Sequence, residues 1–389
     1  MMNMRSLVWL LLGTLFMASC TAADEDTAGR LVVVDDGNVI VMDPDGGNRI
    51  DVTESPSSGP ERAFYFQPTW SPDGTLLAFS EISPATRLHI ASPDDGIMSS
   101  LDLGTLPFYM SWSDTNTLAT LRNGDNGLRL ETTTRESLAE GLEPVDEGQP
   151  LYFSWEPSGE RLVTHIGIDR LELNEDGARQ PLGPVPGDFQ APHWTDAGIV
   201  AVAQDGLDQK LAVISADGTS IPLARTPGPT YLVPTGDGSR VAAQVAGGEP
   251  DGLSVLFQEI PVLPTNQLVV ADSDGTVTVV SESPVLAFFW SPAGDRLLLL
   301  DLVDSGEMRW QVWSGEVLEE LVRFEFEPSF VRDLLPFFDQ YAQSMSLWAP
   351  DGTAFAFPGS IDGEAGIWVQ ELGEPPVLVS DGTWVAWSS

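Results

Sequence analysis

The side chains best suited to chemistry in this 389-residue chain are three histidines and 58 acidic residues. His89, His165 and His193 stand far apart, without the close ligand spacing typical of zinc sites. No Gly-x-Ser-x-Gly elbow of a serine hydrolase is present either. We therefore expect no catalytic residue and no metal ligand, and we expect the histidines to be packed or surface residues.

Two Asp-Gly turns, 43–48 and 272–275, begin like calcium-binding loops. Neither is followed by the bidentate glutamate that completes an EF-hand. Such turns also connect the outer strands of small sheets, because Asp accepts hydrogen bonds from the turn backbone. We expect no cofactor, and a bound calcium ion stays open as the alternative.

The charge balance excludes one class of partner. The formal net charge is −40, from 58 acidic residues and only 18 Lys and Arg. A chain of this charge repels phosphate backbones, so we expect no nucleic-acid partner. We interpret the acidity as a solubilising surface and expect a monomer, with cation binding or adaptation to high salt as the alternative.

Cys20 is the only cysteine, so the chain has no intrachain disulfide. Before it, Arg5 precedes an apolar run at 7–16, and small residues follow at 18–19. This layout predicts a secretory signal peptide at 1–19, since the run is too short to span a bilayer comfortably.

The sequence around Cys20, Met-Ala-Ser-Cys, resembles a bacterial lipobox. The resemblance implies lipidation of Cys20 and export to the cell envelope, on the outer face of the cytoplasmic membrane or facing the periplasm. The alternative is an ordinary signal peptide with an incidental cysteine. Residues 20–29 are small and acidic, which predicts a short disordered tether.

A repeated turn organises the rest of the chain. The segment 70–79, WSPDGTLLAF, returns at 290–298 and at 348–356, with a weaker copy at 155–163. Repeats spaced by roughly 40 residues, each with content for four strands, predict propeller blades. The eight reference positions are Trp70, Trp112, Trp155, Trp194, Pro234, Trp290, Trp348 and Trp387.

Each repeat has a clear physical logic. Trp70 ends an inner strand and is expected to wedge between blades, while Asp73 and Gly74 form the tight turn that follows. We predict an all-β fold, a single β-propeller over 30–389 with four-stranded blades. We expect eight blades, with seven as the alternative, and we expect the N- and C-terminal strands to share one blade.

Two insertions depart from the repeat, at about 246–265 and 327–344. The second carries aromatic and polar residues that either plug the channel or form a binding patch. Four further aromatic residues, Tyr109, Tyr152, Tyr231 and Trp384, each stand three residues before a reference position. This spacing predicts either an aromatic collar at one mouth of the channel or packing between blades. The candidate binding residues are Phe337, Phe338, Asp339, Gln340, Tyr341, Tyr109, Tyr152, Tyr231 and Trp384.

The Trp-Ser-Pro-Asp-Gly turn followed by a Leu-Ala-Phe strand resembles the repeat of the TolB-like β-propellers, over nearly all of the mature chain. That resemblance implies a periplasmic or surface protein that acts as an interaction scaffold. TolB has an additional N-terminal α/β domain and six blades, so a role in the Tol–Pal system does not carry over.

Two functions follow from these observations. The first is a lipid-anchored, non-enzymatic propeller that binds or scaffolds a protein or peptide. The alternative is a propeller that binds or processes carbohydrate through an acidic central funnel, with or without a cation. A polar funnel with converging carboxylates favours the alternative, whereas an apolar-rimmed face built by the insertions favours the first.

Overall fold

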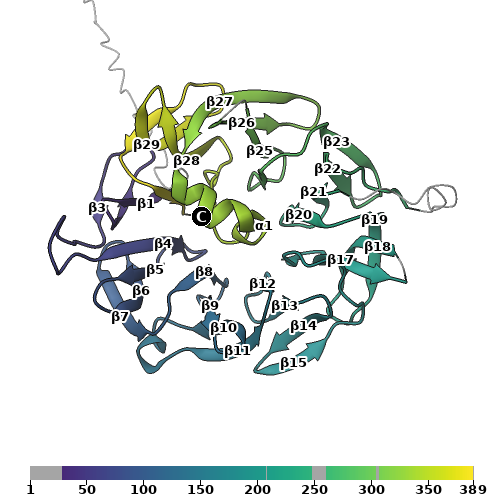
Figure 1. Ribbon diagram of the computed structural model, residues 1–389, viewed down its shortest axis with the longest axis horizontal. Coiled ribbons are helices and arrows are strands. Elements are labelled where there is room, and N and C mark those ends of the chain that lie inside the picture. Colours follow the sequence, from purple (N-terminus) through teal and green to yellow (C-terminus); the bar gives the residue numbers. More distant parts are fainter. Residues whose placement is uncertain (1–28, 207, 248–259, 304–305, 389) are drawn as a thin grey trace, which may run out of the picture.

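The computed structural model describes residues 29–206, 208–247, 260–303 and 306–388. In Figure 1 small sheets stand side by side in a ring around a central axis. The expected signal peptide, Cys20, most of the tether and residues 248–259 of the first insertion lie outside the described residues. Within these ranges, no helix has the length and apolarity needed to cross a membrane.

Antiparallel four-stranded sheets account for most of the ring. Five of them each use four consecutive strands, as the repeat predicts. Their strands are β4 (Phe64–Trp70), β5 (Leu77–Ile82), β6 (Thr86–Ser92), β7 (Gly96–Leu103); β8 (Pro107–Trp112), β9 (Leu118–Gly124), β10 (Gly127–Thr133), β11 (Glu143–Gly148); β12 (Leu151–Trp155), β13 (Leu162–Ile166), β14 (Arg170–Glu175), β15 (Ala178–Pro181); β16 (His193–Thr195), β17 (Gly198–Asp205), β18 (Asp208–Ile214), β19 (Ser220–Arg225); and β20 (Thr230–Pro234), β21 (Arg240–Val245), β22 (Leu268–Asp272), β23 (Val277–Ser281).

The two chain ends form a sixth four-stranded sheet, in the order β3-β2-β1-β31. Leu31 pairs with Trp387, and the Ser388 amide donates to the Arg30 carbonyl at 2.8 Å. The expected sharing of one sheet by both ends is therefore confirmed, and it closes the ring without a free edge at the joint. The strands are β1 (Leu31–Asp35), β2 (Asn38–Met42), β3 (Ile50–Asp51) and β31 (Trp384–Trp387).

A seven-stranded sheet covers the last two repeats. Its two parts are joined only by two residue pairs between β27 and β28, and Trp348 makes an isolated bridge to Phe355 where an inner strand is expected. The β-propeller fold is thus present, while the count of eight blades stays a prediction. The strands are β24 (Ala287–Trp290), β25 (Leu297–Leu302), β26 (Glu307–Trp313), β27 (Leu318–Phe326), β28 (Ala354–Ile361), β29 (Glu364–Glu371) and β30 (Val377–Ser380).

The core lies between neighbouring sheets. The second strand of each unit carries a mostly apolar run, and Leu77, Ala78 and Phe79 of β5 are all fully buried. Such a run is covered on both faces, which is why it does not alternate with polar residues. Burial at this scale is the main favourable contribution to folding.

The repeated tryptophans join neighbouring blades by hydrogen bonds. The Trp70 indole donates to the Ala386 carbonyl at 3.3 Å, and that carbonyl immediately precedes the previous reference residue, Trp387. The indoles of the 112, 155, 290 and 348 positions follow the same rule at 2.9–3.2 Å. Each of these indoles is therefore both an apolar wedge and a donor to the preceding blade.

The turn after Trp70 satisfies its own polar groups. Ser71 Oγ and the Thr75 amide both donate to Asp73 Oδ1, at 2.6 and 3.0 Å. Partial burial raises the pKa of Asp73, but hydrogen bonds from Ser71, Asn116 and Thr75 outweigh it and lower this pKa overall. Gly74 has φ of +67°, a conformation that favours glycine.

The ring has two faces, defined by the direction of the inner strands. The turn face carries the Trp-Ser-Pro-Asp-Gly turns, where inner strands such as β4 end. The insertion face lies opposite, where inner strands begin, and both insertions leave it, after β21 and after β27. Both ends of the described part of the chain lie at the turn face, because Leu31 pairs with Trp387 there.

Candidate functional site

The second insertion forms a helical segment that crosses the middle of the ring, as Figure 1 shows in yellow-green. A π-helical turn at Phe330–Leu334 leads into a 3-10 turn at Leu335–Phe337 and a short α-helix, α1 (Phe338–Tyr341). A separate 3-10 turn, Leu138–Glu140, lies in the connection after β10. We call residues 330–345 the plug.

The plug touches inner strands around the whole ring. Tyr341 packs edge-on against Tyr109 of β8, with ring centroids 5.1 Å apart, and lies 6.2 Å from Trp384 of β31. Phe338 packs against Tyr231 of β20 and Phe288 of β24, at 5.7 and 4.9 Å. These contacts close the centre of the ring with side chains.

Gln340 and Tyr341 fasten the plug with hydrogen bonds. The Gln340 amide donates to the Phe153 carbonyl at 2.8 Å and accepts from the Phe153 amide at 3.1 Å. The Tyr109 hydroxyl donates to the Gln340 carbonyl at 3.0 Å, and Gln67 donates to the Tyr341 hydroxyl at the same distance. Gln340 is 1% exposed, so breaking this pairing leaves buried groups unsatisfied.

Asp339 is a carboxylate buried at the centre of the ring. Its oxygens accept from the Ala191 amide at 3.2 Å and from the Gln340 amide at 3.1 Å. Burial raises the pKa of Asp339 to about 6, and the backbone hydrogen bonds oppose that shift only in part. His193 lies close by, and burial lowers its pKa to about 3, so the imidazole is neutral at pH 7.

A pocket opens beside the plug, between the β8–β11 and β12–β15 sheets. It has a volume of about 410 Å³. Its walls are mostly apolar and aromatic, with Phe108, Leu121 and Leu128 from the sheets, Phe189 from the connection between β15 and β16, and Phe337 from the plug. A few polar groups at a mostly apolar pocket of this size are typical of ligand sites.

The structure brings five of the nine candidate binding residues to this pocket and leaves four outside it. Phe337 is 42% exposed at the wall, whereas Gln340 and Tyr341 are buried at its floor. Phe338 and Asp339 serve the packing of the plug instead. The pocket residues among the candidates are Tyr109, Tyr152, Phe337, Gln340 and Tyr341, and the others are Phe338, Asp339, Tyr231 and Trp384.

The residues three positions before a reference position lie in inner strands: Tyr109, Tyr152, Tyr231 and Trp384. Tyr109, Tyr231 and Trp384 each contact a ring of the plug. Tyr152 instead stacks on Phe189 with ring centroids 4.7 Å apart. Tyr109 and Tyr152 also line the pocket, whereas Tyr231 and Trp384 do not. The choice between a binding collar and packing stays a prediction.

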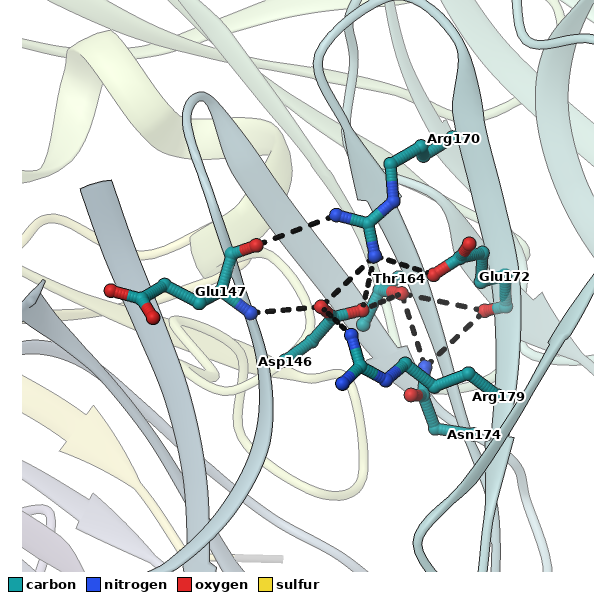
Figure 2. A network of polar contacts seen from close by, with 7 residues as sticks. All are labelled: Asp146, Glu147, Thr164, Arg170, Glu172, Asn174 and Arg179. Atoms are coloured by element: carbon teal, nitrogen blue, oxygen red, sulfur yellow. Dashed lines mark hydrogen bonds and ion pairs between the residues drawn. The ribbon is translucent and has the colours of Figure 1, made fainter. Parts of the chain in front are cut away.

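Figure 2 shows an ion-pair network that holds the two sheets beside the pocket together. Asp146 of β11, whose side chain is fully buried, accepts from Arg170 of β14 at 3.0 Å and from Arg179 of β15 at 2.8 Å. Arg170 also donates to Glu172 at 2.6 Å. The connection between these sheets, 149–151, lines the pocket, so the network fixes one wall. Sequence reasoning missed it, because acidic residues are too numerous to single out one.

Exposed apolar side chains gather on the insertion face. Of the sixteen large apolar side chains that are exposed among the described residues, ten lie there. A surface of this kind marks an interaction site when the residues are contiguous. The ten are Phe64, Phe66, Ile82, Ile168, Val185, Tyr231, Leu286, Leu302, Phe326 and Phe337; the six elsewhere are Ile97, Met98, Ile221, Val279, Val317 and Val377.

The remaining histidines have structural surroundings. His89 lies between Glu81 and Ser100, at 2.7 Å from each, and His165 Nδ1 lies 2.9 Å from the Gln190 carbonyl. Burial lowers the pKa of both rings, for His165 to about 4. In the described ranges, no three His, Cys, Asp or Glu residues are grouped so that they could hold a metal ion.

The Asp43 turn satisfies its carboxylates internally. Asn48 donates to Asp43 Oδ2 at 2.6 Å, and the Gly47 amide donates to Asp45 Oδ1 at 2.7 Å. At 272–275, the Thr276 amide donates to Asp274 at 2.9 Å. These bonds are those of connecting turns, and calcium binding at either turn stays untested.

Comparison with known proteins supports the fold. No family model and no curated protein matches the chain. A eukaryotic initiation factor structure is 10% identical, with a TM-score of 0.56 over 92% of this chain and 98% of that one. An oligogalacturonate lyase in complex with manganese is 12% identical, with a TM-score of 0.54 over 90% and 99%.

TolB from Acinetobacter baumannii is also similar, at 12% identity and a TM-score of 0.40 over 74% of this chain. The chain spans 62% of the length of that TolB. At identities of 10–12%, the likeness to the initiation factor and to the lyase shows the fold alone, a β-propeller.

Proposed function

We propose that this chain is a lipid-anchored, extracytoplasmic β-propeller that binds a protein or peptide partner through its insertion face, without catalysis. The observation that carries this proposal is that ten exposed apolar side chains, the aromatic pocket and the points where both insertions leave the ring lie on one face. Interfaces are enriched in aromatic residues at their cores. The repeat scaffold supplies the rigidity that such a surface needs.

The position of the chain ends supports an orientation for this surface. Residue 29 and the C-terminal strand lie at the turn face, where the Gly29 backbone lies near Pro350 and Ser388. A tether that runs from Cys20 to this point places the turn face toward the membrane. The insertion face then points away from the membrane, toward a partner.

The carbohydrate alternative requires an open acidic funnel. At the centre of the ring, the plug instead places Phe338, Gln340 and Tyr341 together with a single carboxylate, Asp339, all buried. This arrangement favours recognition on the face over chemistry in the channel. The pocket beside the plug adds a recessed, mostly apolar surface to the insertion face.

Paired surface variants test the proposal. The chain, tagged at its C-terminus on the turn face, is incubated with the envelope proteins of its own cell. Replacing Ile168 and Leu302 of the insertion face (74% and 54% exposed) by Glu should abolish capture of a partner. The matched control, Val317→Glu with Val377→Glu (61% and 58% exposed), should retain it. Equal loss in both variants, or in neither, would contradict the proposal.

A further inference from the structure

The pocket beside the plug has the chemistry of a site for one class of side chain. We propose that it accepts an aromatic side chain presented by a basic peptide segment. This inference rests on the proposed function, and it names the kind of partner that the insertion face recognises.

The walls of the pocket fit a planar apolar group. Phe108, Phe189 and Phe337 present aromatic surfaces, and Leu121 and Leu128 complete the apolar lining. Aromatic rings pair best edge-to-face or offset, which such mixed walls allow. A volume of about 410 Å³ is large enough for an aromatic side chain and part of its own backbone.

The pocket also offers hydrogen-bonding groups that suit a peptide backbone. Asn123 and Gln149 line it, and both are exposed. Among the described residues, neither side-chain amide takes part in a hydrogen bond within the chain. An amide both donates and accepts, so each can bond an N–H or a C=O of a bound peptide.

Charge decides between a basic and an acidic peptide. All seventeen Lys and Arg residues of the described ranges are already engaged: fifteen form ion pairs with carboxylates, Arg240 lies 4.8 Å from the Trp290 ring centroid, and Arg296 donates to the Gly352 carbonyl at 2.9 Å. The net charge of −40 favours a cationic partner over an anionic one.

Carboxylates also stand near the pocket itself. Asp188 directly precedes the wall residue Phe189, and Asp333 lines the rim beside Arg332, with which it is paired at 2.6 Å. Asp169 lies in the β13–β14 turn on the same face. Arg332 also lines the rim, so its charge and that of Asp333 offset each other, and Asp188, Asp169 and the net charge of the chain favour a cationic segment over an anionic one.

Three acetylated and amidated pentapeptides serve as probes, with the sequences KKWKK, KKAKK and EEWEE. Binding to the full chain is measured by isothermal titration at low and high NaCl concentration. We expect KKWKK to bind at least about tenfold more tightly than either of the others, and to bind less tightly as salt screens the charges.

A matched pair of variants locates the binding. Phe337→Ala removes a pocket wall, whereas Phe326→Ala removes a side chain of similar exposure (38% against 42%) on the same face but outside the pocket. Neither residue is buried, so both variants should fold, which thermal melting checks. We expect Phe337→Ala to weaken KKWKK binding about tenfold or more and Phe326→Ala to leave it unchanged.

Each outcome is informative. Equal binding of KKWKK and KKAKK, or equal sensitivity to the two variants, overturns the aromatic pocket. Equal binding of KKWKK and EEWEE overturns the basic segment. Binding of methyl glucoside in place of the peptides, lost in Phe337→Ala, overturns the inference in favour of carbohydrate. The face variants of the previous section test the proposed function separately, since partner capture can depend on Ile168 and Leu302 without depending on Phe337.

Discussion

The turn face and the insertion face use aromatic residues in opposite ways. On the turn face, indoles such as Trp70 and Trp348 are buried between blades and donate to the neighbouring inner strand. On the insertion face, Phe64, Phe326 and Phe337 are each about two-fifths exposed. The comparison shows a division of roles. Aromatic residues of the turn face stabilise the fold, whereas those of the insertion face stay partly exposed and are available for binding.

The largest loss of stability should come from removing a buried indole of the turn face. Trp70→Ala removes a 7%-exposed indole that bonds Ala386 and carries the Arg30 guanidinium over its ring at 5.7 Å. We expect a loss of about 3–5 kcal/mol in the free energy of unfolding, because a large cavity opens between blades. Denaturant unfolding measures it, with Phe337→Ala as the insertion-face counterpart. Similar losses in the two variants would erase the distinction between the faces.

A smaller loss in the free energy of unfolding is expected for a substitution in the plug. The plug is part of an insertion on the insertion face, but its side chains are packed as in a core. Gln340→Ala leaves the Phe153 amide without a partner and the Phe153 carbonyl with only the long bond from Gln343, at a cost of roughly 2–4 kcal/mol. Gln343→Ala is the control, because Gln343 reaches the same carbonyl only at 3.4 Å. This variant should lose less than about 1 kcal/mol in the free energy of unfolding. An unchanged unfolding midpoint in Gln340→Ala would mean that the plug does not contribute to global stability.

The buried carboxylate of the plug should make stability depend on pH. The pKa of Asp339 is raised from 3.8 to about 6, so the folded chain holds this proton more strongly than the unfolded chain does. Its contribution is fully present below pH 4 and is lost as the pH rises through 6, by up to roughly 3 kcal/mol. Asp339→Asn, which keeps an acceptor oxygen, should therefore match the wild type at pH 4 and exceed it at pH 7.5. Parallel stability profiles of the two proteins across this range would contradict this account.

The scaffold was predictable from the sequence, because its information is local and repeated. Trp70, Asp73 and Gly74 specify a strand end and a tight turn wherever they recur, and ring closure follows from the strands missing at one end and present at the other. The pairing of Leu31 with Trp387 bears out that reasoning.

The binding surface was predictable only in part, because it depends on contacts between residues far apart in the chain. The aromatic spacing pointed to Tyr109 and Tyr152, and the insertion pointed to Phe337, but nothing local indicates that these three line one pocket. Phe189 and Leu128 carry no signal in the sequence, since an apolar residue reads the same at a pocket wall and in a core.

The most direct test of the difference between the faces is photo-crosslinking in the cell. A photoreactive benzoylphenylalanine is placed singly at Ile168 or Leu302 on the insertion face, and at Val317 or Val377 on the other, all of them more than half exposed. We predict a crosslink to the same partner from both insertion-face positions and from neither of the others. Crosslinks from Val317 and Val377 alone, or equally from all four positions, would contradict the assignment of binding to the insertion face.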